Sequence, residues 1–135
     1  MLIIANWKMK LSVAASQTLA QDLRSRLGTP PAGTEVVVCP NFLSLANVAA
    51  KLKGSAIKLG GQDCFWEAQG AFTGEIAPDD LREHGCEYVI LGHSERRLYL
   101  GETDEQIHRK LEAALRAGLT PILCVGEDWQ QRSAK

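Results

Sequence analysis

Short apolar runs alternate with amphipathic segments along the chain, and this order constrains the fold more than any other feature. The runs are rich in β-branched residues and do not alternate strictly with polar positions, which is typical of strands buried on both faces. They lie at residues 2–5, 36–38, 57–61, 88–91 and 121–125. Repeated alternation of strand and helix indicates a parallel sheet with right-handed crossover connections.

Helical patterns occupy the gaps between these runs, at about residues 15–27, 45–52, 78–85 and 103–115. The last pattern is the clearest, because Thr103 and Gln106 can form a capping box and Gly118 follows the final turn. The polar residues 126–135 could begin a further helix. The order βαβαβαβαβ contains no linker or low-complexity segment, so we predict a single domain over residues 1–135.

Two α/β architectures fit this order of elements. One is a doubly wound open sheet of five strands, and the other is part of a (β/α)8 barrel. The length of 135 residues suits the open sheet better, because a complete barrel typically needs about 250 residues. The order of elements leaves both open, so the residues at the strand ends must distinguish them.

The balance of charge argues against nucleic acid or membrane partners. The sequence has 15 basic and 16 acidic residues, a net charge of −1, and no basic stripe. No stretch approaches about 18 apolar residues and no basic leader precedes the first run, so we expect a soluble, cytoplasmic protein. The cysteines form no C-x-x-C pair and the histidines are scattered among them, so we predict no metal site. Cys39 and Cys124 lie in apolar runs, where small buried side chains are expected.

Polar residues follow the first apolar run, at the end of the strand where parallel α/β folds collect their functional sites. Asn6 and Lys8 flank the bulky Trp7, so they could point to one side while Trp7 packs on the other. A lysine in this position can hold an anionic oxygen as a compact point charge. The alternative is a surface lysine with no such role, and the spacing alone does not decide between the two.

The fourth run ends in GHSERR at residues 92–97, an order that a plain connecting turn does not require. Gly92 lets the backbone turn and Ser94 can cap a following helical turn, which would place His93 beside a helix N-terminus. The positive end of that helix favours a neutral ring that can donate a hydrogen bond. The alternative is a capped loop with a surface network of ion pairs among Arg96, Arg97 and Glu102.

Several common catalytic motifs are absent from the sequence. There is no G-x-G-x-x-G after the first run, no G-x-x-x-x-G-K-[ST] and no G-x-S-x-G. The first run leads to a lysine instead of a glycine cradle, which weakens the nucleotide-binding interpretation of a doubly wound sheet. A five-stranded α/β module that binds a small anion at Lys8 and His93 stays open as a hypothesis.

Five segments together resemble the triosephosphate isomerase family. They are ANWKMK at 5–10, GQDC and GAFTGEIAP within 61–78, YVILGHSERR at 88–97, ETDEQIHRKLEAAL at 102–115 and PILCVGE at 121–127. The resemblance runs in order over all 135 residues, and the joint occurrence of ANWKM, GAFTGE and GHSERR is highly specific. It implies an incomplete (β/α)8 barrel, a half-barrel with parallel strands. The family's complete barrel interconverts dihydroxyacetone phosphate and glyceraldehyde 3-phosphate without a metal or cofactor.

The resemblance also implies roles for individual residues. Asn6 and Lys8 match the family's substrate-contacting pair, and Lys8 would stabilise the negative substrate and its enediolate. His93 matches the histidine that contacts the substrate and polarises its carbonyl, and Glu95 matches a carboxylate held near the lysine. In the family's homodimer the tip of a long loop enters the partner subunit, and this tip corresponds to Phe72, Thr73 and Gly74.

Only the family's first five strands have counterparts in this sequence. In the family the catalytic glutamate base follows the sixth strand, and the phosphate-binding loops follow the seventh and eighth. Cys124 and Glu127 match supporting positions, and neither Glu95 nor Glu127 stands where the base would. We therefore expect little or no activity from this chain alone, and activity with a C-terminal half-barrel partner. We also expect a homodimer or higher oligomer, with a non-catalytic, self-associating half-barrel as the alternative.

Overall fold

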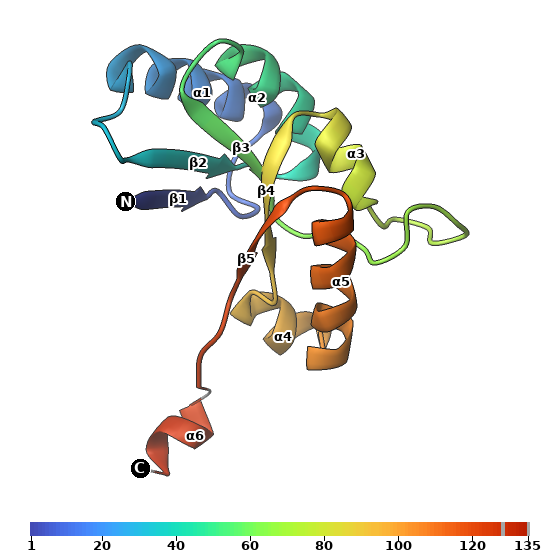
Figure 1. Ribbon diagram of the computed structural model, residues 1–135. Coiled ribbons are helices and arrows are strands. Elements are labelled where there is room, and N and C mark those ends of the chain that lie inside the picture. Colours follow the sequence, from blue (N-terminus) through green and yellow to red (C-terminus); the bar gives the residue numbers. More distant parts are fainter. Residues whose placement is uncertain (128, 135) are drawn as a thin grey trace.

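The computed structural model describes residues 1–127 and 129–134. Five strands form one parallel sheet in the order β1-β2-β3-β4-β5 (Figure 1). Their bounds are Leu2–Asn6, Glu35–Cys39, Ile57–Gly61, Cys86–Leu91 and Thr120–Leu123. The predicted parallel sheet is confirmed, and the third strand has the predicted bounds.

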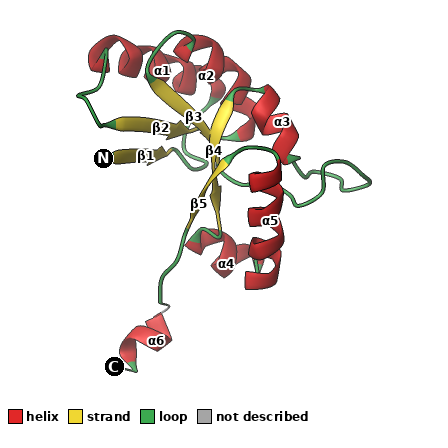
Figure 2. Ribbon diagram, viewed as in Figure 1, coloured by secondary structure: helices red, strands yellow, loops and turns green. Residues whose placement is uncertain are grey.

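Helices follow the strands, as Figure 2 shows. They are α1 (Val13–Leu27), α2 (Leu45–Leu52, after a 3₁₀ turn at Phe42–Ser44), α3 (Pro78–Glu83), α4 (Ser94–Leu100), α5 (Asp104–Arg116) and α6 (Trp129–Ser133). The capping box at the start of α5 forms as predicted, with Thr103 and Gln106 each accepting a backbone N–H of the other. Where the sequence predicted one helical turn after His93, α4 is a helix of seven residues.

Two apolar clusters lie on opposite faces of the sheet, as the alternation along β2 shows. Val36 and Val38 belong to the larger cluster, which also takes side chains from α1, α2, α3 and α5. Val37 and Cys39 belong to a smaller cluster built from β2, β4 and residues 122 and 124. The helices thus cover one face. A sheet in sequence order with helices on one face is part of a barrel, whereas a doubly wound sheet reverses its strand order.

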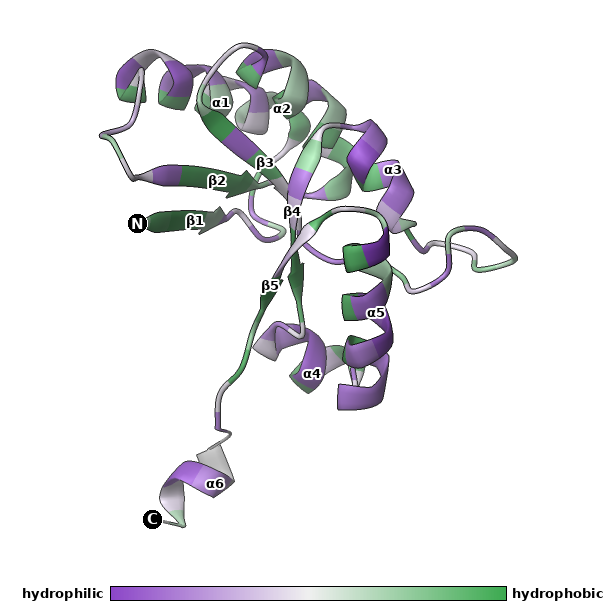
Figure 3. Cartoon of the chain, in the orientation of Figure 1, coloured by the Kyte–Doolittle hydropathy of each residue, from purple (hydrophilic) through white to green (hydrophobic). Residues whose placement is uncertain are grey.

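The two edge strands of the sheet differ from the central strands in pairing and in burial. Strands β1 and β5 each have one neighbour, as predicted. Burial on both faces was predicted for every strand, and for β1 and β5 this prediction is wrong. No residue of β5 is buried, and its Leu123 is 44% exposed. Leu2, Ile3 and Ile4 are 48%, 45% and 36% exposed, because β1 lies at the edge of the sheet. Figure 3 shows this strand as a hydrophobic margin.

The cysteines are free thiols packed into the fold. Burial raises the pKa of Cys39, Cys64 and Cys86 to about 12, so these thiols stay protonated and unreactive near neutral pH. Cys124 is half-buried. Across the described part of the chain, no helix is long and apolar enough to cross a membrane.

A long loop, residues 62–77, projects from the body between β3 and α3 (Figure 1). Its two arms are tied together, because the Phe65 N–H donates to the Ile76 carbonyl at 2.8 Å. The Phe65 and Phe72 rings lie 4.7 Å apart. Arg109 of α5 lies over the Trp66 ring, 4.3 Å from its centre. The loop therefore holds a defined shape, in which Phe72 is half-exposed.

Candidate active site

A cavity of about 360 Å³ opens at the carboxyl ends of the strands. Its lining includes Asn6 and Lys8 from the end of β1, Gln62 from the end of β3, and His93 and Glu95 from the end of β4. The predicted catalytic and substrate-binding residues, more than 80 positions apart in sequence, therefore meet around one hollow. Phe72, Thr73 and Gly74 lie in the projecting loop and do not line it.

Lys8 stands in an uncommon backbone conformation. Its φ is +53°, the one positive φ of a non-glycine residue among those the structure describes, and such a conformation is strained for a side chain with a Cβ. The Asn6 Oδ1 accepts the Lys8 N–H at 2.9 Å and thereby supports the turn. Trp7 is buried in the larger apolar cluster. Asn6 and Lys8 separate from Trp7 as predicted, but through this turn after β1 and not through strand alternation.

Gln62 also holds the Lys8 turn, a role that was not predicted. Its Nε2 donates to the carbonyl oxygens of Lys8 and Cys39, both at 2.9 Å. One amide group therefore links the ends of β1, β2 and β3. Its position in the sequence could have indicated this role, because Gln62 directly follows the third run, at a strand end where functional residues are expected.

Lys8 and Glu95 form an ion pair beside the cavity. The Lys8 Nζ donates to Glu95 Oε1 at 2.6 Å, and both side chains are about half exposed. The hydrogen bond from Lys8 holds the pKa of the Glu95 carboxyl below its ordinary value. Glu95 thus stays ionised and directs the ammonium group of Lys8 toward the hollow, which is the arrangement that the resemblance implied.

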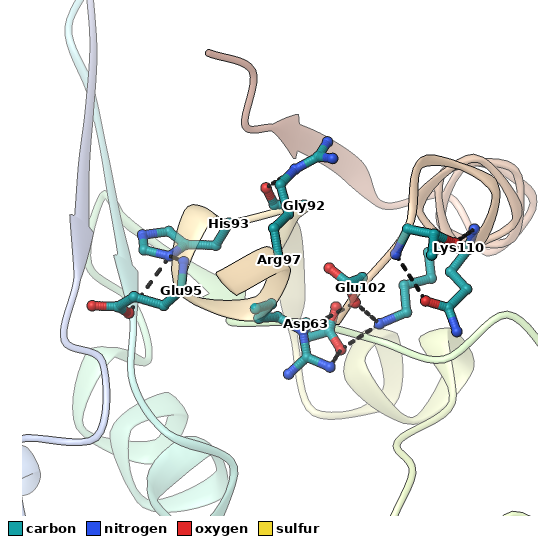
Figure 4. Close-up of polar contacts among 10 residues, drawn as sticks. Asp63, Gly92, His93, Glu95, Arg97, Glu102 and Lys110 are labelled. Carbon is teal, nitrogen blue, oxygen red and sulfur yellow. Dashed lines mark hydrogen bonds and ion pairs between the residues drawn. The ribbon is translucent and has the colours of Figure 1, made fainter. Parts of the chain in front are cut away.

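His93 occupies the N-cap position of α4, whereas Ser94 was the predicted cap. Its Nδ1 accepts the backbone N–H of Glu95 at 3.2 Å (Figure 4). A backbone N–H can donate only to a nitrogen without a proton, so this geometry assigns the ring proton to Nε2. Glu95 Oε2 lies 3.5 Å from the same nitrogen, too far for a good hydrogen bond. The backbone contact therefore determines the tautomer, which leaves Nε2–H as a donor.

Four charged residues, Asp63, Arg96, Glu102 and Lys110, form a set called here the buried ion cluster, and two of them, Asp63 and Arg96, also line the cavity. Arg96 contacts Asp63 at 2.8 Å and Glu102 at 3.1 Å. Lys110 contacts Asp63 at 2.7 Å and also Glu102. Arg96 and Glu102 were predicted to pair at the surface, but Glu102 is buried. Figure 4 shows Asp63, Glu102 and Lys110 grouped together.

The charges of the buried ion cluster balance, but its hydrogen bonding is incomplete. Asp63 Oδ1 and Glu102 Oε2 are buried and have no partner among the described residues. Burial raises the pKa of Asp63 to about 6, although Lys110 and Arg96 oppose this shift. Burial acts to raise the pKa of Glu102 as well, but contacts with Lys110 and Arg96 together outweigh it and hold this pKa below its ordinary value. The two carboxyls therefore differ, and Asp63 is the one that gains a proton on mild acidification.

Arg97 was predicted to share a network of ion pairs with Arg96 and Glu102, and this prediction is wrong. Its Nη1 contacts Asp104 Oδ1 at 2.6 Å, and its Nε donates to the Gly92 carbonyl at 2.9 Å. Gly92 has φ +69°, and a Cβ there would lie 3.0 Å from Ile107 Cδ1 and 3.2 Å from Arg97 Nη2. Only glycine fits this turn without strain.

Glu127, matched to a supporting position, lies at a second cavity with Arg97 and Asp104. Within residues 1–127 and 129–134, no three histidine, cysteine or acidic side chains are grouped as metal ligands.

A curled parallel sheet with helices outside and polar residues at its carboxyl ends defines the chain as part of a (β/α)8 barrel. The sequence profile of one family, triosephosphate isomerase, matches residues 1–135. The chain therefore belongs to the triosephosphate isomerase family.

Individual relatives agree with this assignment. The triosephosphate isomerase of Chloroflexus aurantiacus is 53% identical over 133 residues, which cover 98% of this chain and 53% of that protein. The Pelobacter propionicus enzyme of the same name is 49% identical over 134 residues, 99% of this chain and 53% of that protein. The crystal structure of Bartonella henselae triosephosphate isomerase superposes with a TM-score of 0.85 at 36% identity and covers 98% of this chain and 54% of that chain. The chain spans about half the length of the relatives that it matches.

Proposed function

We propose that this chain supplies the lysine and histidine of a triosephosphate isomerase site that interconverts dihydroxyacetone phosphate and glyceraldehyde 3-phosphate. The observation that carries the proposal is the meeting of Asn6, Lys8 and His93 around one cavity of about 360 Å³. The shared family and the names of the relatives support it. The reaction is a step of glycolysis and gluconeogenesis, and a cytoplasmic location goes with it.

In this proposal each residue has a distinct task. Lys8 attracts the anionic triose phosphate and stabilises the negative charge that develops on its oxygens. His93 donates a hydrogen bond from Nε2 to the carbonyl oxygen and polarises it. Glu95 and Gln62 hold Lys8 through its ammonium group and its carbonyl oxygen. The reaction moves only protons, so the proposal includes no metal or cofactor.

Removal of a proton from the substrate carbon requires a carboxylate within hydrogen-bond reach. Glu95 is engaged with Lys8, Asp63 in the cavity wall is engaged with Lys110 and Arg96, and Glu127 lies at the second cavity. We therefore propose that the base and the phosphate grip come from a C-terminal half-barrel partner or segment outside the described part. Alone, the chain would then turn over weakly or not at all.

Replacing Lys8 by Met is expected to weaken the binding of phosphoglycolate, a phosphorylated carboxylate anion, by about 10- to 100-fold, because one charged hydrogen bond is lost. The measurement is a titration of the 135-residue chain that follows the ring resonances of His93 at constant ionic strength. Lys53→Met, at an exposed lysine after α2, is the matched control and should bind as the wild type does. Binding that does not move His93, or that survives in Lys8→Met, would remove the support for this site.

The second candidate function is that of a non-catalytic half-barrel that assembles with itself. The exposed apolar side chains of β1, an edge strand with one neighbour, favour it. The loop tip at Phe72, Thr73 and Gly74 is proposed as a contact with the partner subunit of a homodimer. Both candidates share the prediction that the chain forms a dimer or higher oligomer.

Replacing Ile3 by Lys should shift this assembly toward monomer, because a charge on the edge strand opposes edge-to-edge pairing. Light scattering over a range of concentrations measures the change in mass. Leu115→Lys places the same charge at an exposed position on α5 and should leave the mass unchanged. A wild-type chain that is folded and monomeric at every concentration would contradict self-association.

A further inference from the structure

The side chain of Arg97 folds back from α4 onto the end of β4. Its Nε donates to the Gly92 carbonyl oxygen at 2.9 Å and its Nη1 to Asp104 Oδ1 at 2.6 Å. Asp104 is the first residue of α5. Figure 4 shows Arg97 beside Gly92, on one side of the turn, and the His93 ring and Glu95 on the other side. One guanidinium group therefore connects the strand end that carries His93 to the first turn of the next helix.

The oxygen that Arg97 holds belongs to the peptide unit between Gly92 and His93. This unit is planar, so fixing its oxygen fixes ψ of Gly92 and φ of His93 together. Those two angles set the direction in which the His93 ring leaves the backbone. Gly92 itself gives little restraint, because glycine has the widest choice of backbone conformations. The restraint must come from a contact, and the Arg97 Nε–H provides one.

We propose that Arg97 is a positioning residue for His93. By holding the Gly92 carbonyl it keeps His93 at the N-cap of α4, where Nδ1 accepts the Glu95 N–H and Nε2–H is left to donate. Arg97 does not line the cavity of Lys8 and His93, so it acts through the backbone and not on the substrate. The proposal deepens the proposed function, on which it rests for the role of His93.

The chemistry of arginine suits this task better than that of lysine. A guanidinium presents several N–H donors in a rigid planar fork, so two of them can bind two acceptors in fixed directions. An ammonium is a compact charge whose donors rotate, and it does not define an orientation in this way. Asp104 accepts a hydrogen bond from the outer end of the fork. This contact helps to fix the plane of the guanidinium that donates to Gly92.

The test is the tautomer of His93, read from its ring ¹⁵N resonances in the 135-residue chain. In the wild type we expect one fixed tautomer, with the proton on Nε2. In Arg97→Met we expect the two nitrogen resonances to converge as the tautomers exchange, and the Glu95 amide resonance to shift. Arg97→Lys should restore the wild-type pattern only in part. The matched control is Arg116→Met, at an exposed arginine of α5 that pairs with Glu112 at 3.8 Å, and it should leave His93 unchanged.

A folded Arg97→Met chain whose His93 keeps the wild-type tautomer would overturn the proposal. If Arg97→Met does not fold, Asp104→Ala serves instead, because it removes only the outer contact. A smaller convergence in the same direction would then support the proposal, and an unchanged His93 would overturn it. Phosphoglycolate titration separates the two claims. Failure of the wild type to bind counts against an anion site at Lys8 and His93, on which the proposed function rests, whereas the tautomer result stands without any ligand.

Discussion

Replacing His93 by Gln is expected to lower turnover by about 10²- to 10³-fold in an assembled enzyme. The flexible Gln amide lacks the fixed orientation of the imidazole, and this is the usual cost of losing one oriented donor at a developing oxyanion. The assembled enzyme would be this chain produced together with the unmatched remainder of the Chloroflexus aurantiacus relative. The loss should fall on kcat and leave KM within a few-fold. His93 is proposed to interact with charge that forms during the reaction, and Lys8 to provide most of the ground-state attraction.

The matched control is His108→Gln, at an exposed histidine of α5 that faces Glu112, and its turnover should equal that of the unsubstituted assembly. The pure 135-residue chain is assayed in parallel, with the expectation of little or no turnover. An assembly confirmed by mass that stays inactive would contradict the proposal that a C-terminal half-barrel completes the site. Turnover in the isolated chain that disappears in His93→Gln would instead show that self-association supplies a substitute base.

The fold could be predicted closely because local and long-range signals agree. Residues 57–61 form β3 as predicted, and the capping box at Thr103 and Gln106 begins α5 where the pattern indicated. The burial of β1 could not be predicted from its composition. LIIA is as apolar as the central runs, but whether its faces are covered depends on which elements pack beside it.

Four residues of the candidate site were predicted from the sequence: Asn6, Lys8, His93 and Glu95. The structure places all four around one cavity. Their roles stay predictions, as does the partner contact at Phe72, Thr73 and Gly74. The left-handed turn at Lys8 was missed because it depends on hydrogen bonds from distant residues, including Gln62, which is 54 positions away. The N-cap was assigned to Ser94 because serine is the commoner cap, whereas the histidine ring takes that role here.

In the buried ion cluster, the charged type of a side chain gives a wrong expectation of its burial. Lys110 is three residues after Ile107 and four before Ala114, so it lies on the same face of α5 as these two apolar residues. It is only 3% exposed. A lysine is rarely buried without a partner, and the position of Lys110 could therefore have predicted a buried carboxylate. It could not have identified Asp63, which is 47 residues away.

Replacing Lys110 by Met is expected to lower the free energy of unfolding by about 3–5 kcal/mol, the usual cost of removing one member of a buried ion pair. Methionine has a similar length, so packing changes little while one positive charge is lost. Arg96 alone would then face the carboxylates of Asp63 and Glu102. Urea unfolding of the substituted and wild-type chains at neutral pH measures the difference.

The pH dependence distinguishes lost charge from lost packing. Burial raises the pKa of Asp63 to about 6 in the folded chain, and Lys110 opposes that rise. Without Lys110 the folded pKa of Asp63 goes higher, so the folded variant binds more protons than the folded wild type over this range. The variant therefore regains stability as pH falls from about 8 to about 5, and its deficit shrinks. Ile107→Ala, on the same helix, should cost about 2–5 kcal/mol through its cavity, independently of pH. A Lys110→Met deficit that is equally independent of pH would mean that the lysine stem, and not its charge, stabilises this region.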